Sequence, residues 1–198
     1  RQDIPLCAIR KGGSYLAAVA MGQEDGMYQS KLLLMRTDEE EISAQTELGN
    51  DLIYDVAFAN ESTICCIGQS QAVWYDLQLQ RTGRYSYNED YLTDYDMGGS
   101  GFLTLILNTY QAGNHSSIVT VGAAGEELGR VGIDGQLLDL SVAGDYVALL
   151  TPDMLTIYDK TLTPVARREN TKGYTHAVQH ADGSVILIAD GRGELYLP

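Results

Sequence analysis

The sequence lacks the long apolar segments and the basic clusters that mark several large protein classes. Its longest apolar runs, Leu16–Met21 and Phe102–Leu107, fall far short of the ~20 residues that a membrane-spanning helix requires. Only 13 lysines and arginines stand against 27 aspartates and glutamates, so the formal net charge is −14. Nucleic acids and anionic membrane surfaces are held by clustered basic residues. The composition therefore argues against both as partners.

Cysteine is also scarce, and its three positions do not suggest a disulfide framework. Cys7 stands alone, whereas Cys65 and Cys66 are adjacent, and neighbouring side chains of a strand point to opposite faces. We expect all three to be buried, reduced thiols, the usual state of this small apolar side chain in a strand. A redox switch formed by the adjacent pair is the alternative, but no basic residue lies close in sequence to lower a thiol pKa.

Histidine is equally rare, with three copies in the chain. His176 and His180 are four residues apart, which is about 13 Å along a strand, so they cannot share one metal ion there. The stretch Gly98–Phe102 has a phenylalanine where a nucleophile elbow needs its last glycine. Because no general base can be paired with a nearby nucleophile, we expect a protein that is not an enzyme and that has no metal and no cofactor.

Glycine and tyrosine are abundant instead, with 21 and 13 copies. Glycine supplies positive φ angles in turns, and tyrosine covers half-buried pleated surfaces. Between residues 136 and 169, four runs of β-forming residues are separated by turns containing Gly, Pro, Asp or Lys. Helix signals are nearly absent, so the sequence predicts an all-β protein.

An internal repeat of about forty residues runs through the chain. Tyr75 and Tyr158 lie in near-identical settings, and weaker copies of their position recur at spacings of 40, 46, 37 and 38 residues; the five members are Met35, Tyr75, Val121, Tyr158 and Tyr196. A second position, expected in the strand that begins each repeat, recurs at spacings of 49, 39, 45 and 37 residues, in Leu6, Asp55, Asp94, Asp139 and His176. The two markers drift together, which argues against chance.

Four-stranded units of this length, repeated several times, predict a β-propeller of antiparallel blades. We place the repeats near residues 1–50, 51–90, 91–132, 133–171 and 172–198, within a single propeller domain or part of one that spans 1–198. The fifth repeat stops after its third strand. Either the N-terminal residues supply the missing outer strand of a five-bladed ring, or the chain is a fragment of a larger propeller.

The most unusual segment, residues 85–96, is rich in tyrosine and acidic residues and has no lysine or arginine. It connects the outer strand of one repeat to the first strand of the next, so part of it is expected on a face that propellers use for binding. The candidate binding residues are Tyr85, Tyr87, Glu89, Asp90, Tyr91 and Asp94. The alternative is that the rings pack between blades with solvated acids between them.

The repeated position in the first strands gives a second candidate site. If these strands are innermost, a ring of side chains would approach the propeller axis and could hold a cation or a polar ligand; its members are Asp55, Asp94, Asp139 and His176. Leu6 in the first repeat weakens this interpretation. The alternative is structural, with the aspartates accepting backbone hydrogen bonds from an adjacent blade or turn.

Several stretches resemble a known family. Residues 85–96, 101–107, 144–153 and 155–159 resemble a β-propeller family of unknown function from clostridia-type Gram-positive bacteria and, more distantly, WD40 and quinoprotein-type propellers. Members of that family carry an N-terminal membrane-spanning helix with the propeller outside the cell. The resemblance therefore implies an extracytoplasmic, cell-surface-anchored protein whose anchor is missing from this chain, and it implies no catalytic residues.

Together these observations predict a non-catalytic propeller that serves as an extracytoplasmic interaction platform for a protein or a polysaccharide. The acidic charge favours a basic or cation-bridged partner. Two alternatives remain open. One is a propeller that uses the axial carboxylates to bind a small ligand or cation, or for catalysis, and the other is a structural spacer module.

Overall fold

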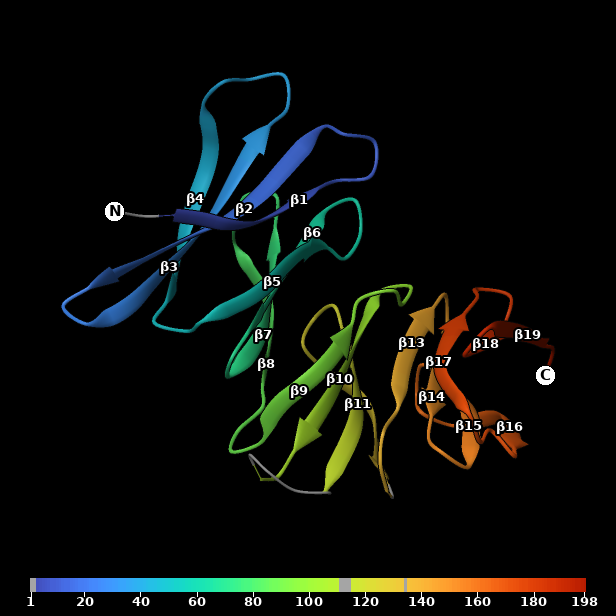
Figure 1. Ribbon diagram of the computed structural model, residues 1–198. Helices are drawn as coiled ribbons and strands as arrows, with labels where there is room; N and C mark the ends of the chain where they lie inside the picture. The colour runs from blue at the N-terminus through green and yellow to red at the C-terminus, as the bar shows by residue number, and fades with distance from the viewer. Residues whose placement is uncertain (1–2, 111–114, 134) are drawn as a thin grey trace. The chain divides into compact units, whose positions relative to one another are not determined.

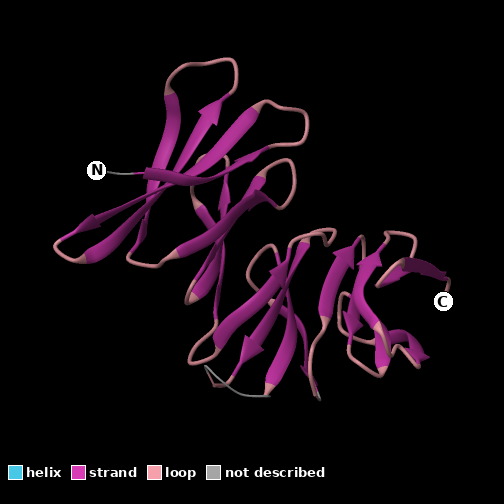
Figure 2. Ribbon diagram, viewed as in Figure 1, coloured by secondary structure: helices cyan, strands magenta, loops and turns pink. Residues whose placement is uncertain are grey.

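All regular secondary structure in the described part of the chain is β-strand (Figure 2). The computed structural model describes residues 3–110, 115–133 and 135–198. Within these residues, no helix has the length and apolar character needed to span a membrane.

The strands form five antiparallel sheets that follow one another along the chain (Figure 1). The first contains β1 (Asp3–Ile9), β2 (Tyr15–Glu24), β3 (Met27–Arg36) and β4 (Ile42–Gly49). The second contains β5 (Ile53–Phe58), β6 (Thr63–Gly68), β7 (Gln71–Asp76) and β8 (Arg81–Ser86). The third contains β9 (Tyr91–Asp96), β10 (Phe102–Asn108), β11 (Ser116–Gly122) and β12 (Glu127–Ile133). The fourth contains β13 (Asp139–Ala143), β14 (Tyr146–Leu150), β15 (Met154–Asp159) and β16 (Pro164–Glu169), and the fifth contains β17 (Tyr174–Gln179), β18 (Val185–Ala189) and β19 (Arg192–Tyr196).

Within every sheet the strands lie side by side in the order of the sequence. Four sheets have four strands and the fifth has three. Short sheets of this kind, each made from one continuous stretch of chain, are the blades of a β-propeller. The predicted all-β propeller fold class is confirmed.

The chain divides into two compact units, which are described separately. Unit 1 comprises Arg1–Asn88 and Ala123–Glu126, and it holds the first two sheets. Unit 2 comprises Glu89–Gly122 and Glu127–Pro198, and it holds the last three sheets.

The middle strands of the second, third and fourth sheets are buried on both faces along most of their length, which explains their nearly continuous apolar sequences. In β10 every residue from Phe102 to Leu107 is buried, whereas the outer strand β16 alternates between exposed and half-buried positions along most of its length. Apolar cores fill the space between successive sheets within each unit. Leu34 packs with Val56 and Ile64 in unit 1. Burying one such side chain contributes roughly 1.5–3 kcal/mol, so these cores are the main source of stability.

The repeated Tyr-Asp pair ends the third strand in the same turn in two sheets. The Oδ1 atom of Asp76 accepts hydrogen bonds from the amides of Gln78 and Gln80, at 2.9 and 2.8 Å. Asp159 Oδ1 does the same with the amides of Thr161 and Thr163, at 2.8 and 3.0 Å. The side chain thus satisfies turn amides that have no strand partner.

The cysteines differ in part from the expectation. Cys65 and Cys66 are buried free thiols, as expected, but Cys7 is exposed, so the prediction that all three are buried is wrong. Cys7 lies in the edge strand β1, where Leu6 and Ala8 face the core and Cys7 faces the other side. Burial raises the pKa of the Cys66 thiol to about 12, with a further contribution from Asp55, and burial also raises the pKa of Cys65. Both are therefore protonated and poorly nucleophilic at neutral pH.

Candidate functional site

The tyrosine-rich segment 85–96 crosses the boundary between the two units after Asn88, so its two parts are described in turn. In unit 1, Tyr87 has a relative exposure of only 1% and its hydroxyl has no hydrogen-bond partner. The prediction of Tyr87 as a surface binding residue is therefore wrong, because a partner on the surface cannot reach it. Burial raises the pKa of Tyr87, so its hydroxyl stays protonated at neutral pH. The half-buried ring of Tyr85 lies 6.4 Å from that of Tyr87, tilted by 52°, which matches the alternative of ring packing.

The unit 2 part of the segment is more accessible. Tyr91 is 46% exposed and Glu89 is also exposed. Asp90 is half-buried and its Oδ2 atom lies 3.4 Å from the Nη1 atom of Arg130. Ion pairs that solvent can reach, as it can this one, contribute little to stability, commonly about 0–1 kcal/mol. Tyr91 and Glu89 thus remain available to a partner.

The four predicted axial residues share one kind of position in the first strands. Each lies opposite a branched apolar residue of the second strand; the pairs are Asp55 with Ile67, Asp94 with Ile106, Asp139 with Leu150, and His176 with Ile188. Three of the four lie next to an irregularity in the strand register. They are Asp55 in β5, Asp94 in β9 and His176 in β17. Such bulges re-aim side chains.

Asp55 and Asp94 each bond to the backbone of their own strand. Asp55 Oδ1 accepts from the amide of Val56 at 2.7 Å, and Asp94 Oδ1 accepts from the amide of Tyr95 at 2.8 Å. Asp94 is exposed and has no ion-pair partner within the described residues. Its charge is therefore open to an incoming group.

Asp139 links the fourth and fifth sheets of unit 2. Its Oδ2 atom accepts a hydrogen bond from the amide of Ala177 in β17 at 2.7 Å and lies 3.5 Å from Nδ1 of His176. Beside it, the hydroxyl of Ser141 accepts from the amide of Gln179 at 3.0 Å. These contacts correspond to the structural alternative for this aspartate, in which a side chain satisfies the edge amides of the next sheet.

Asp96 belongs to the same group, although the repeat pattern did not identify it. Its Oδ2 atom accepts from the amide of Val142 at 2.8 Å and its Oδ1 atom from the amide of Gly98 at 2.6 Å. Burial raises the pKa of Asp96, and the nearby charges of Asp94 and Asp139 act in the same direction, so that the two amide hydrogen bonds are outweighed. The two-residue offset from Asp94, which puts both side chains on one face of a strand, is the signal that could have found it.

We call Asp94, Asp96, Asp139 and His176 the first-strand acidic row. All four belong to unit 2, and the charges of Asp94 and Asp139 both raise the pKa of Asp96. Among the described residues, no group of three or more His, Cys, Asp or Glu side chains has the arrangement of a metal site. The row is a negatively charged surface with hydrogen-bonded anchors at Asp96 and Asp139.

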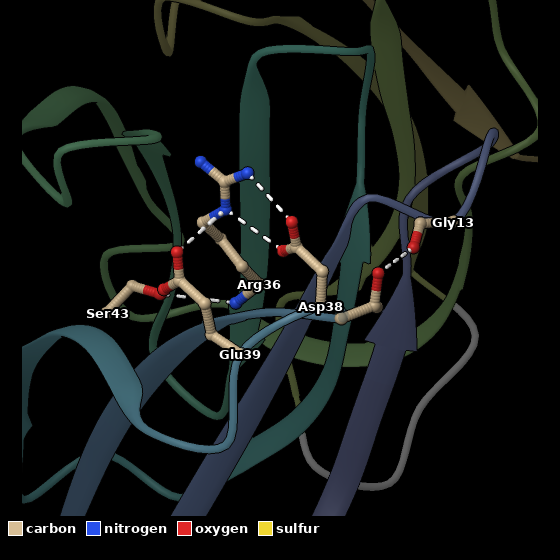
Figure 3. A network of polar contacts seen from close by, with 6 residues as sticks. Gly13, Arg36, Asp38, Glu39 and Ser43 are labelled. Atoms are coloured by element: carbon tan, nitrogen blue, oxygen red, sulfur yellow. Dashed lines mark hydrogen bonds and ion pairs between the residues drawn. The ribbon is translucent and has the colours of Figure 1, made fainter.

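A second acidic stretch, residues 38–41, lies on the loop between β3 and β4 (Figure 3). The guanidinium of Arg36 bonds to both carboxylate oxygens of Asp38 at 3.1 Å and lies 3.2 Å from Glu39. The hydrogen bond from Arg36 lowers the pKa of Asp38. The loop is further held by the Thr37 hydroxyl, which donates to the carbonyl of Gly13. Part of its charge is thus neutralised internally, which makes this loop a weaker candidate than the first-strand acidic row.

Comparisons with known proteins identify the fold. The chain matches no protein-family model and no curated protein sequence at significant similarity. Among the solved structures that resemble it are two crystal structures of Sqt1 from Chaetomium thermophilum, one of them bound to the N-terminus of the ribosomal protein L10. The TM-score is 0.67 for both, with 13% and 12% identity, and the match covers 100% of this chain but 58% and 61% of the Sqt1 chains. At this identity the likeness shows the fold alone.

The structural comparison contradicts the expected extracytoplasmic, cell-surface localisation. Sqt1 was solved with a segment of a ribosomal protein, which points away from the cell surface. The expectation of a cell-surface protein followed from a resemblance in the residues that form the strands and turns of the blades. These residues determine the fold but carry no information about the cellular compartment.

Proposed function

We propose that this chain is a non-catalytic protein-interaction module of the β-propeller class, which binds a basic segment of a partner protein on the first-strand acidic row. The observation that carries the proposal is the row itself. Carboxylates from the first strands of successive sheets gather on one unit, and the exposed one, Asp94, has no cationic partner among the described residues.

Electrostatics favour a basic partner. The chain has a formal net charge of −14, and a field of one sign raises the rate at which oppositely charged partners associate. Within the row, Asp96 and Asp139 are held in place by backbone amides, so their charges are preorganised. A lysine or arginine arriving at this surface would relieve the mutual repulsion of the carboxylates, which is a gain beyond its own ion pair.

A protein segment fits this surface better than a polysaccharide. Neutral sugars are usually bound by stacking on exposed aromatic rings, and within the segment 85–96 the ring of Tyr87 is buried, which leaves Tyr91 as the strongly exposed ring. The crystal structure of Sqt1 bound to the N-terminus of a ribosomal protein supports the same choice, because there a protein of similar fold binds the end of a polypeptide.

The test is fluorescence anisotropy with a labelled lysine- and arginine-rich 15-residue peptide and a glutamate-rich peptide of the same length. We expect saturable binding of the basic peptide only, and about threefold to tenfold weaker binding by Asp94→Asn, from the loss of one ion pair of about 1 kcal/mol. Asp153→Asn is the matched control, because Asp153 is an exposed acid in a turn outside the row.

Equal weakening by both variants would mean that the peptide responds only to net charge and that the row is not the site. Tyr91→Ala serves as a second probe on the same strand. If Tyr91 and the first-strand acidic row form one binding surface, this variant also weakens binding while its circular dichroism spectrum stays unchanged. Binding of the glutamate-rich peptide with similar affinity would overturn the proposal.

A further inference from the structure

A cavity of about 330 Å³ lies between the first and second sheets, wholly within unit 1. Its lining comes from the end of β4, the connection to β5, and the face of β6, β7 and β8 that packs against the first sheet. The lining residues include Leu48, Asp51, Cys66, Gln71, Val73, Tyr75 and Arg81. Its volume is at the lower end of the range of about 300–1,000 Å³ that is usual for small-molecule sites.

Three polar groups that line this cavity form no hydrogen bond and no ion pair with the described residues. The Oε1 atom of Gln71 is buried and accepts no hydrogen bond. The guanidinium of Arg81 forms no ion pair, and the hydroxyl of Tyr75 makes no hydrogen bond. Buried polar groups are satisfied in the great majority of proteins, so an unsatisfied acceptor that lines a cavity calls for an occupant that donates.

The acids of the cavity, by contrast, are already engaged. The carboxylate of Asp51 accepts hydrogen bonds from the amide and hydroxyl of Ser70, at 3.2 and 3.0 Å. Glu47 lies 2.8 Å from Nζ of Lys31. These two carboxylates nevertheless disfavour a multiply charged anion such as a phosphate dianion, whereas a single negative charge would be balanced by Arg81.

The strand register places the unpaired groups at opposite ends of one face. Tyr75 is the direct cross-strand partner of Arg81, so their side chains share a face. Gln71 lies four residues earlier on β7, which is about 13 Å along a strand on that same face. Val73 lies between them, and Cys66, its cross-strand partner, lies beside it. The cavity therefore has a cationic end, an apolar middle and an accepting end.

We propose that this cavity binds a small monocarboxylate with an apolar body and an N–H donor, of the size of an N-acylated dipeptide. The carboxylate would meet Arg81 and the Tyr75 hydroxyl, the apolar side chain would pack on Val73, and the N–H would donate to Gln71. This site uses residues of unit 1 and is independent of the acidic row in unit 2.

The probe is N-acetyl-alanyl-leucine, titrated by calorimetry and by NMR chemical-shift changes. The matched ligands are its C-terminal carboxamide, which lacks the charge, and its form methylated at both amide nitrogens, which lacks the N–H donors. We expect saturable binding of the acid, with about tenfold weaker binding of each matched ligand. Failure of the acid to saturate at any accessible concentration would overturn the proposal.

Variants locate the contacts. Arg81→Gln is expected to weaken binding of the acid about tenfold and to bind acid and carboxamide equally, since the group that distinguishes them is gone. Gln71→Met is expected to stop distinguishing the N–H form from the N-methylated form. Arg167→Gln, a substitution of an exposed arginine in β16, is the control and should bind like the parent protein. An Arg81→Gln variant that still prefers the acid would place the ligand elsewhere and refute the assignment.

Discussion

At the scale of single residues, Tyr87 shows how burial decides the role of a side chain. Its hydroxyl is buried without a hydrogen-bond partner, and leaving such a group unsatisfied costs about 1–3 kcal/mol. Tyr87→Phe removes the hydroxyl and keeps the ring, so we expect an unchanged or higher free energy of unfolding, by up to about 1 kcal/mol. Tyr87→Ala should lose about 3–5 kcal/mol by opening a cavity. Urea denaturation measures both. A clear loss of stability in Tyr87→Phe would show that the hydroxyl has a partner after all.

Asp96 predicts a dependence of stability on pH. Burial, followed by the charges of Asp94 and Asp139, raises its folded-state pKa above the ordinary value of 3.8. A raised pKa means that the native state holds the proton more tightly than the unfolded state. The stabilisation that comes from protonated Asp96 is therefore complete below pH 3.8 and is lost as pH rises through the folded-state pKa. At pH 7 the ionised carboxyl therefore lowers the free energy of unfolding.

Asp94→Asn removes one of the charges that raise this pKa and keeps an oxygen to accept from Tyr95. We expect the free energy of unfolding at pH 7 to rise by about 0.3–1 kcal/mol, a range set by the exposure of Asp94. The gain should vanish near pH 3, where the Asp96 carboxyl is protonated, and denaturant curves at both pH values measure it. A gain that persists at pH 3 would have another cause. The same variant is expected to bind the basic peptide less well, so its effects on stability and binding have opposite signs.

At the scale of elements, the junction between the third and fourth sheets depends on a close approach of backbones. A Cβ atom at Gly98 would lie 2.1 Å from the carbonyl oxygen of Val142. Gly98→Ala should therefore force the sheets apart or bend the turn, with a loss of about 1–3 kcal/mol as in other overpacked sites. Gly132→Ala in β12 is the control, because nothing lies within 4 Å of a Cβ there. Thermal unfolding of both variants measures the difference, and equal behaviour would argue against this tight junction.

The sequence predicted the blades well because the signals that form them are local. Asp76 and Asp159 are each bonded within five residues, so the same turn can be recognised wherever its short pattern recurs. Asp96 was missed because its partner Val142 is 46 residues away. Gln71 and Arg81 could not be predicted for a similar reason. A side chain is unpaired only because no partner lies near it in the folded structure, and local sequence does not show this. Long-range contacts of this kind leave no trace in local sequence pattern.

At the scale of the whole molecule, composition predicts the sign of the charge but not where the charge acts. Each unit carries more carboxylates than cations, and part of this charge is neutralised locally, as in the loop at Arg36. The first-strand acidic row differs because its exposed member has no cation near it in the described structure. The resemblance that suggested a cell-surface protein rested on strand and turn residues, which many propellers of unrelated function share.

The net charge of −14 predicts that salt has opposite effects on stability and on binding. Raising NaCl from about 0.1 to about 1 M shortens the Debye length from about 10 to about 3 Å, which screens repulsion within the protein and attraction to a basic peptide alike. We expect Tm to rise by about 2–4 °C, the shift that corresponds to about 1 kcal/mol in a chain of this size, while the basic peptide binds at least about tenfold more weakly. Calorimetry and anisotropy at matched salt concentrations measure the two effects.

Near pH 4.4, the pI of the sequence, the net charge is close to zero and the gain in Tm should disappear. An equal gain in Tm at pH 4.4 would show that salt acts through apolar burial. Repulsion among the acidic side chains would then not limit stability.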